Sequence, residues 1–505
     1  MFRIFGPPGT GKTTTLLNMV DKALEAGTPP DRIAFLAFTR KAATEARDRA
    51  AERFNLDPKK DLIFFRTLHS LALTMSDIRP EQVMQEENYR ELSRTIGVEL
   101  GAQKNTSIDE DVPSMVASSD PILGLINLAR LRKVDLRDQY NESQIEQDWN
   151  TVNFVDKCLR EYKESMGFFD FTDMLQHFAE GGETFCPKFD LCFLDEAQDL
   201  SPLQWDIAHL LDKQSTKMYC AGDDDQAIYR WAGADVDHFI NLPGGSEILS
   251  QSYRIPKRVH DVAENVVRRI GRRFPKQYEP RSELGNVTRI TTINSLDMSQ
   301  GDWLILSQAG YQLNPVAQDL KSNGYLFNYR GRRSISEKVS EAVNGWEQLR
   351  KGREISGKVA RMVYSYMSIG ERVVRGFKKL SGVEDDDLVT FDKLTANHGL
   401  LAKDNMIWSE AMDKLPDTDR AYVTALLRRG EKFNGVPRIT ASTIHGSKGG
   451  EADNVILFTD LSPAADTQFQ RNPDDTHRVF YVGVTRAKQN LYIVDAEDVS
   501  RSYDL

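Results

Sequence analysis

Eight residues near the amino terminus have the types and spacing that could hold a nucleotide. Glycines let backbone N–H groups turn toward phosphate oxygens, and a helix that follows adds its positive end. Lys12 would reach the β and γ phosphates, and Thr13 would offer its hydroxyl to Mg²⁺. The run fits the phosphate-loop spacing G-x-x-x-x-G-K-[ST], and with Thr14 it predicts a site for ATP and Mg²⁺: Gly6, Pro7, Pro8, Gly9, Thr10, Gly11, Lys12 and Thr13.

Two adjacent carboxylates could supply the other half of this chemistry. Asp195 and Glu196 follow the apolar run 191–194, which places them at the carboxyl end of a strand, where ligands bind in parallel sheets. Asp195 would hold Mg²⁺, and Glu196 would accept a proton from the attacking water. An acidic strand end is usually a solvated turn, but a phosphate loop without a magnesium carboxylate would lack half its chemistry. The pair therefore favours metal-bound nucleotide hydrolysis.

The elements that must position these residues alternate between strands and helices, which is typical of a parallel sheet covered by helices. Apolar patterns predict a helix over 14–26, a second helix that starts at 314, and strands over 33–38, 191–194, 217–221, 287–292, 303–307, 439–442 and 455–459. The intervening segments are helical and charged, and the first contains a polar interruption at 101–120. We therefore predict two α/β motor domains (1–70 with 165–245, and 246–350 with 437–505), each split by a mostly helical insertion (71–164 and 351–436).

The bulk composition limits the possible partners and compartments. The formal net charge is −10 over 505 residues, so any contact with a polyanion must be local. The four cysteines have neither paired zinc spacing nor a disulfide framework. No apolar run approaches the roughly 20 residues of a membrane span, and a glycine loop stands where a signal peptide would be. We expect a cytoplasmic protein, in a bacterium or a phage-infected host, without membrane contact.

Further motifs, in order, resemble those of the UvrD, Rep and PcrA branch of superfamily 1 DNA helicases over nearly the whole chain. Many ATPases share the phosphate loop and the carboxylates, so the additional motifs make the resemblance specific. They are AFTRKAA (37–43), RTLHS (66–70), DFTDML (170–175), DEAQD (195–199), GDDDQAIYRW (222–231), QSYR (251–254), TIHGSKGGE (443–451) and YVGVTRAK (481–488). The resemblance implies that the two α/β domains are RecA-like.

The resemblance also implies roles around the nucleotide. Gln226 would sense the γ phosphate, and Arg254 and Arg486 would act as arginine fingers from the second lobe, which agrees with the cations that phosphoryl transfer requires. Tyr253 would stack on the base, and Glu451 would touch the ribose. A single arginine is more often a surface or ion-pair residue, so these assignments depend on the motif settings.

For nucleic acid, the resemblance points to aromatic faces that stack on bases without reading sequence. A Trp beside a Tyr is more often core packing, but Trp231 precedes Ala232-Gly233, which is poor core context. The basic run 268–273 could meet phosphates or be a solvated helix end. The expected DNA contacts are Phe38, His69, Tyr229 and Trp231 by stacking, Arg40 and Lys41 at phosphates, and His445 and Lys448 in the fifth motif.

Three features depart from the family pattern. Only five residues precede Gly6, where relatives carry a glutamine segment that recognises adenine; one hypothesis is that stacking on Tyr253 holds the base and GTP or CTP can replace ATP, and another is a misassigned start codon. The third motif lacks a second arginine after Trp231, and the fifth has Gly450-Glu451-Ala452 in place of a leucine and an aromatic. Both changes predict altered coupling.

We therefore expect a monomeric motor that hydrolyses Mg-ATP, moves along single-stranded DNA and separates strands at single-strand/duplex junctions, in DNA repair or replication. The 3′→5′ direction is implied by resemblance alone, and strand separation would be an isomerase activity. The nearest alternative is a translocase that remodels protein–DNA complexes with weak unwinding. A nucleic-acid-binding regulator with a vestigial ATPase, or a P-loop kinase of small substrates, has no use for this full set of motifs.

Overall fold

The computed structural model describes residues 1–505 except 102–119, 144, 434 and the side chain of Lys41. The chain divides into two compact units: Met1–Asn286 with Ala465–Lys488, and Val287–Ala464 with Gln489–Leu505. Most of the polar interruption predicted at 101–120 lies outside the described residues. Within the described part of the chain, the helices lack the combination of length and apolar content that a membrane crossing requires.

The first unit is built on a parallel sheet with the strand order β3-β2-β4-β5-β1-β6. Its strands are β1 (Phe2–Phe5), β2 (Ile33–Ala37), β3 (Phe65–Thr67), β4 (Phe189–Leu194), β5 (Ser215–Gly222) and β6 (Ser246–Ile248). Because the strands are parallel, their carboxyl ends share one edge of the sheet. The segments that follow β1, β2, β4 and β5 therefore meet at that edge.

Helices cover both faces of this sheet, as the burial of β2 requires. All five residues of β2 are buried, which is typical of a central parallel strand. Ile33 and Phe35 join one core cluster with α1 (Lys12–Glu25) and α2 (Arg40–Phe54). Ala34 and Leu36 join another with α3 (Leu68–Met75), α8 (Phe171–Gly181) and α9 (Pro202–Lys213). Successive residues of a strand point to opposite faces, so these two clusters lie on the two faces of the sheet.

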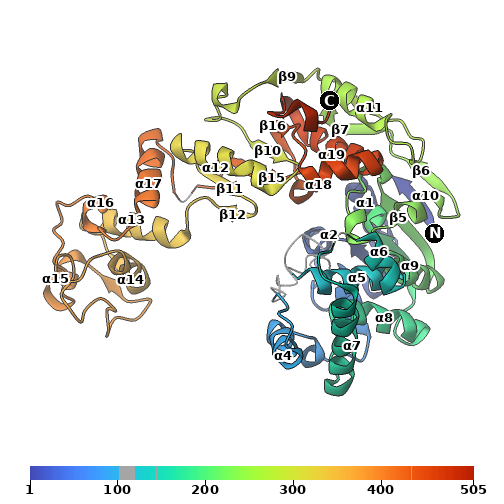
Figure 1. Ribbon diagram of the computed structural model, residues 1–505, viewed down its shortest axis with the longest axis horizontal. Helices are drawn as coiled ribbons and strands as arrows, with labels where there is room; N and C mark the ends of the chain where they lie inside the picture. Colours follow the sequence, from blue (N-terminus) through green and yellow to red (C-terminus); the bar gives the residue numbers. More distant parts are fainter. Residues whose placement is uncertain (102–119, 144, 434) are drawn as a thin grey trace. The chain divides into compact units, whose positions relative to one another are not determined.

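Further helices of the first unit lie outside this sandwich (Figure 1). Four are α4 (Glu86–Ile96), α5 (Pro121–Arg132), α6 (Leu136–Glu142) and α7 (Trp149–Met166), and they surround an apolar cluster of their own. The remaining elements are α10 (Val236–Asn241), the parallel pair β7 (Gln251–Pro256) and β8 (Glu279–Arg281), α11 (Lys257–Val267) and α19 (Pro473–Val484). Helix α19 packs against α11, so a late segment of the chain completes the first unit.

The second sheet has the order β12-β11-β15-β10-β16-β17-β9. Its strands are β9 (Asn286–Ile290), β10 (Trp303–Ser307), β11 (Phe327–Tyr329), β12 (Arg332–Arg333), β15 (Ile439–Thr443), β16 (Ala452–Phe458) and β17 (Ala487–Val494). The strand β10 pairs in parallel with β15 and β16, whereas β11 and β12 form an antiparallel hairpin. The chain is thus an α/β protein with parallel sheets flanked by helices, which confirms the predicted class.

In the second unit, one apolar cluster connects the sheet to the helices inserted into it. Ile305 and Phe327 of the sheet belong to the same cluster as Trp346, Tyr364 and Trp408. The helices are α12 (Leu313–Ser322), α13 (Glu337–Leu349), α14 (Gly357–Ser365), α15 (Phe391–Asn397), α16 (Trp408–Ala411) and α17 (Asp417–Arg429). Helix α18 (Pro463–Arg471) begins in this unit, and from Ala465 on it belongs to the first unit. A short antiparallel pair, β13 (Ile355–Ser356) and β14 (Leu388–Val389), lies within the segment predicted to be helical.

Candidate nucleotide and nucleic-acid site

The phosphate loop connects β1 to α1 in a conformation that only glycine adopts easily. Gly9 and Gly11 have φ values of 72° and 78°, in the left-handed region where a side chain is strained. A Cβ on Gly6 would lie 2.0 Å from the Cγ of Lys12. Any larger residue at position 6 would therefore displace the lysine that is predicted to reach the phosphates.

Strand β7 holds this loop from the other side. The Oγ of Ser252 donates to the carbonyl of Pro8 at 2.8 Å, and the backbone N–H of Tyr253 donates to the carbonyl of Gly9 at 2.8 Å. A Cβ on Gly9 would lie 2.3 Å from the Cβ of Arg254. Arg254 and the ring of Tyr253, which is 74% exposed, therefore lie beside the phosphate loop and in the same compact unit.

The two predicted carboxylates meet the loop at the carboxyl end of β4. The Oγ1 of Thr13 donates to Asp195 Oδ2 at 2.7 Å, and Lys12 Nζ lies 2.9 Å from Glu196 Oε1. Glu196 has a φ of 56°, which is uncommon for a residue with a side chain and occurs preferentially at functional sites. The phosphate-loop motif and the position of the carboxylates at a strand end predict that these four residues meet.

Protonation at this site follows from burial and from the close charges. Burial by itself disfavours the ammonium form of Lys12, but Glu196, Asp195 and Asp223 outweigh it, so the pKa of Lys12 is raised. Burial raises the pKa of Asp195, and the neighbouring Glu196 adds to this effect although Lys12 opposes it. A divalent cation beside Asp195 would favour its charged form. The hydroxyl of Thr13 and the carboxylate of Asp195 are oxygen donors that suit Mg²⁺.

A chain of hydrogen bonds runs from the carboxylates to Arg486, which lies two residues after the end of α19. Gln198 donates to Glu196 Oε2 at 2.6 Å and accepts from the backbone N–H of Asp223 at 2.9 Å. The Nε2 of Gln226 donates to Asp223 Oδ2 at 2.6 Å, and Arg486 Nη2 donates to Gln226 Oε1 at 2.7 Å. These side chains link the ends of β4 and β5 to the last predicted motif. The predicted residues Lys12, Glu196, Gln226 and Arg486 therefore belong to one connected network.

Sequence reasoning missed the buried ion cluster beneath this network. Lys276 is 7% exposed and lies 3.1 Å from Asp223, 2.6 Å from Asp224 and 2.6 Å from Asp225. Burial opposes its charge, but the three carboxylates raise the pKa of Lys276. The fully buried Arg478 donates to the carbonyl of Asp224 at 2.9 Å. The signal in the sequence was the run of three aspartates, because buried carboxylates need cationic partners.

The basic run 268–273 is partly engaged by carboxylates of the same unit. Arg273 donates to both carboxylate oxygens of Asp225 at 2.8 and 2.6 Å, and Arg272 Nε lies 2.5 Å from Asp237. The backbone N–H groups of Gly271 and Arg272 donate to Asp474. For Arg272 and Arg273, these contacts favour a structural role over the two interpretations from the sequence, which were contact with phosphates and a solvated helix end.

Three of the predicted DNA-contacting aromatics form a row at the same edge of the sheet. The rings of Phe38 and Tyr229 are stacked with centroids 5.6 Å apart, and those of Tyr229 and Trp231 are tilted with centroids 6.3 Å apart. Tyr229 is only 4% exposed, whereas Trp231 is 49% exposed. Trp231 is therefore partly exposed to solvent, and Tyr229 packs between the other two rings.

The remaining predicted contacts differ in their surroundings. His69 is the second residue of α3. Its Nε2 is buried without a hydrogen-bond partner in the described structure, and burial lowers the pKa of His69 to about 4. Arg40 is exposed at the start of α2, whereas the side chain of Lys41 lies outside the described residues. His445 and Lys448 are half-buried and Glu451 is exposed. The last three belong to the second compact unit.

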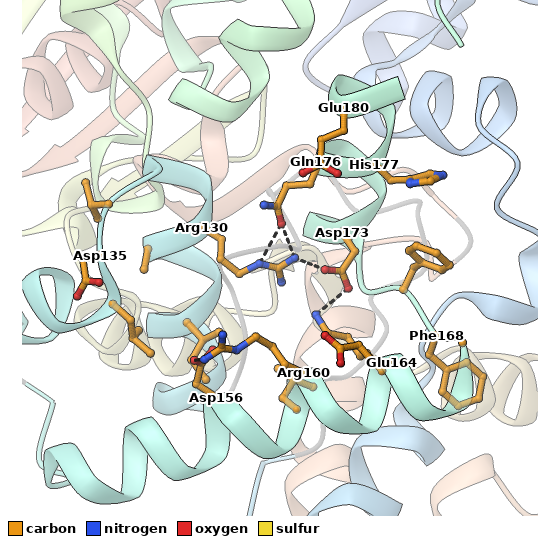
Figure 2. Close-up of a pocket in the computed structure, with 18 residues that line it drawn as sticks. Arg130, Asp135, Asp156, Arg160, Glu164, Phe168, Asp173, Gln176, His177 and Glu180 are labelled. Atoms are coloured by element: carbon orange, nitrogen blue, oxygen red, sulfur yellow. Dashed lines mark hydrogen bonds and ion pairs between the residues drawn. The ribbon is translucent and has the colours of Figure 1, made fainter. Parts of the chain in front are cut away.

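A hollow of about 720 Å³ between α5, α7 and α8 contains many charged side chains (Figure 2). Arg130 pairs with Asp170 and Asp173, and Lys163 lies 2.7 Å from each of the same two carboxylates. Asp170 also accepts from the backbone N–H of Asp173 at the start of α8. The motif 170–175 thus anchors a helix and neutralises two cations, which is a structural role.

Family models match both parts of the chain that carry this network. Residues 2–244 match the model described as UvrD/REP helicase N-terminal domain, and residues 438–494 match the UvrD-like helicase C-terminal domain. Together these segments contain the phosphate loop, the carboxylates, Gln226 and Arg486.

Curated relatives carry helicase names. The ATP-dependent DNA helicase PcrA of Leuconostoc citreum is 27% identical over 54% of this chain, and the match spans only 38% of that relative. PcrA of Bacillus subtilis (strain 168) is 23% identical, with 97% of this chain and 80% of the relative covered. DNA helicase II of Rickettsia typhi is 22% identical, with 98% and 90% covered. By its matched domains and their motifs, the chain belongs to the UvrD/REP helicase family.

Proposed function

We propose that this protein is an ATP-dependent DNA helicase in which hydrolysis of Mg-ATP drives movement along single-stranded DNA and opening of a duplex. The observation that carries the proposal is the hydrogen-bonded network from Lys12 through Glu196, Gln198 and Gln226 to Arg486. It joins residues that would contact ATP to residues next to the aromatic row.

In this proposal the phosphate loop binds the triphosphate, with Lys12 against the β and γ phosphates. Mg²⁺, held by Thr13 and Asp195, would supply charge neutralisation between those phosphates. Glu196 orients the attacking water and accepts its proton. Arg254 and Arg486 stabilise the charge on the transferred phosphoryl group. Gln226 senses the γ phosphate and is hydrogen-bonded to Asp223. Tyr253 stacks on the base, and Glu451 approaches the ribose.

On the DNA side, the exposed face of Trp231 and its neighbours Tyr229 and Phe38 support stacking on successive bases. His69, Arg40, Lys41, His445 and Lys448 are proposed as further contacts with the strand. We also propose that the protein is a monomer, that it acts at single-strand/duplex junctions in the cytoplasm, and that it moves along DNA in the 3′→5′ direction. Trp231 is partly exposed and belongs to the same motif as Gln226, which is part of the hydrogen-bonded network at the phosphate loop. This arrangement supports coupling between ATP binding and DNA binding.

The deciding experiment combines two assays on the full chain. Steady-state hydrolysis of ATP, GTP and CTP is measured with and without single-stranded DNA, and unwinding is measured on duplexes with a 3′ or a 5′ tail. Stimulation by DNA together with opening of the 3′-tailed duplex alone is the expected result. Stimulation without unwinding would instead identify a translocase, and hydrolysis that ignores DNA would refute the motor.

A further inference from the structure

Lys276 is a buried cation that belongs to none of the motifs identified in the sequence. It lies between α11 and β8, outside both segments that match the family models. Its Nζ lies 3.1 Å from Asp223 Oδ1, 2.6 Å from Asp224 Oδ1 and 2.6 Å from Asp225 Oδ2. Burying an ammonium group is costly unless carboxylates compensate it. The compensation here comes entirely from the third motif, 222–231, which contains all three aspartates.

Asp223 depends on Lys276 more than Asp225 does. Asp225 has a second cation, because Arg273 donates to both of its carboxylate oxygens at 2.8 and 2.6 Å. For Asp223, Lys276 is the one cation within ion-pair distance in the described part of the chain. Loss of the positive charge at position 276 would therefore leave Asp223 without a cationic partner, whereas Asp225 would keep one.

Asp223 in turn sets the orientation of Gln226. Its Oδ2 accepts from Gln226 Nε2 at 2.6 Å, and Gln226 Oε1 accepts from Arg486 Nη2 at 2.7 Å. An ionised carboxylate can only accept a hydrogen bond, and a guanidinium can only donate one. Of the two orientations of the Gln226 amide, therefore, only the present one satisfies both neighbours. Asp223 thereby determines which end of Gln226 faces Arg486.

Arg486 is the cation that an uncompensated Asp223 would attract. Gln226 is hydrogen-bonded to both residues, and Arg486 Nε also donates to the carbonyl of Val482 at 3.0 Å. These two contacts of Arg486 are with neutral acceptors, which bind a guanidinium less strongly than a carboxylate does. A buried carboxylate without a cation is unfavourable, so Asp223 would compete with these contacts and draw the guanidinium toward itself.

We propose that Lys276 is a positioning residue for ATP hydrolysis that acts by compensating the charge of Asp223. With this cation in place, Asp223 orients Gln226 and leaves Arg486 at the transferred phosphoryl group. Lys276 itself touches neither ATP nor the attacking water. The inference rests on the proposed function, because that function gives Gln226 and Arg486 their roles at the γ phosphate.

Two double variants with the same change in charge separate this role from a purely structural one. Lys276→Met/Asp224→Asn leaves Asp223 charged but without its cation, whereas Lys276→Met/Asp223→Asn removes that carboxylate charge together with the cation. Each variant loses one positive and one negative charge from the same cluster. The asparagine oxygen can still accept from the backbone N–H of Phe274 in the first variant and from Gln226 in the second.

Steady-state ATP hydrolysis with and without single-stranded DNA gives kcat and KM, and titration of a fluorescent ATP analogue gives its Kd. Lys276→Met/Asp224→Asn should lose about 10²-fold in kcat, because a displacement of about 1 Å near the reacting atoms can cost that much. The Kd of the analogue should change by less than about threefold, since the phosphate loop still binds the triphosphate and the lost interaction belongs to the transition state. Lys276→Met/Asp223→Asn should keep a kcat about tenfold higher than that of the first variant.

The thermal midpoint of each double variant reports whether it is folded. If a methionine variant does not fold, Lys276→Gln replaces Lys276→Met in both, because its amide can donate to the remaining carboxylates. The expected order of the two kcat values is the same for this second pair.

Equal kcat values in the two folded double variants would overturn the inference, because the charge of the cluster as a whole, and not the compensation of Asp223, would then matter. Analogue binding that weakens in step with turnover would also overturn it, since Lys276 would then support the nucleotide site in general. Neither result would affect the helicase proposal. If the parent chain does not hydrolyse ATP, the proposed function itself fails and the inference falls with it.

Discussion

At the scale of single residues, the site depends on side chains that each hold the next one in place. Gln198 illustrates this, because it bonds to both Glu196 and the backbone of Asp223. A Cβ on Gly222 would lie 2.6 Å from its Oε1, so the packing leaves Gln198 little freedom. Such preorganisation allows donors and charges to act without reorganising during the reaction.

Arg486→Gln should reduce ATP turnover by on the order of 10³-fold or more, as expected for an arginine finger. The shorter, neutral side chain loses both the bond to Gln226 and the positive charge that is proposed to stabilise the transferred phosphoryl group. Steady-state hydrolysis with saturating DNA measures the effect. The control is Arg471→Gln, an exposed arginine of the same returning segment, which should keep the parent rate. Parent-like turnover in Arg486→Gln would remove this residue from the catalytic set.

His69 provides a prediction about pH. Its folded pKa of about 4 lies below the unfolded value of about 6.5, so the unfolded chain binds a proton first as pH falls. The stability contributed by neutral His69 is complete above pH 6.5 and is lost as pH falls from about 6.5 to 4, by at most about 3 kcal/mol. His69→Gln should flatten this decline in urea unfolding measured across that range. An equally steep decline in His69→Gln would contradict the buried, neutral imidazole.

At the scale of elements, local patterns predicted much of what the structure contains. Short apolar runs predicted β2, β4, β5 and β10, because each of these signals lies within a few residues. The helix predicted after the glycine loop is present as α1, but it begins at Lys12, two residues before the predicted start. The pairing of Lys276 with Asp223, Asp224 and Asp225 could not be read in this way, since it depends on how segments some fifty residues apart fold together. The two-residue strands β13 and β14 were missed because a pair this short leaves no periodic pattern.

The ion cluster predicts that Lys276→Met is strongly destabilising. The substitution keeps most of the side-chain volume but leaves three buried carboxylates without their shared cation, which typically costs about 3–5 kcal/mol. Chemical denaturation at neutral pH measures the loss. Lys257→Met, at an exposed position of α11, serves as the control and should change the free energy of unfolding by less than about 0.5 kcal/mol. A similarly small effect at position 276 would show that the aspartates are paired by other means.

At the scale of the whole molecule, the chain leaves its first compact unit at Asn286 and returns to it at Ala465. The returning segment carries α19, whose Arg478 is fully buried against Asp224 and whose following residues include Arg486. The phosphate loop and the last motif therefore lie within one compact unit, although they are far apart in the sequence. A sequence pattern gives the order of these motifs, but it does not show that the chain returns to its first unit, because that return depends on tertiary packing.

The return of the chain to its first unit predicts which distant segments change their hydrogen exchange together when nucleotide binds. A non-hydrolysable ATP analogue with Mg²⁺ should slow hydrogen exchange in the phosphate loop and, through Gln226 and Arg486, also in peptides from 473–488. Mass spectrometry of exchanged peptides measures both regions in one experiment. In Arg486→Gln the phosphate loop should still be protected while the response of 473–488 is lost, because the bond to Gln226 is absent. If the parent chain protects the phosphate loop alone, the hydrogen-bond path does not transmit binding to α19.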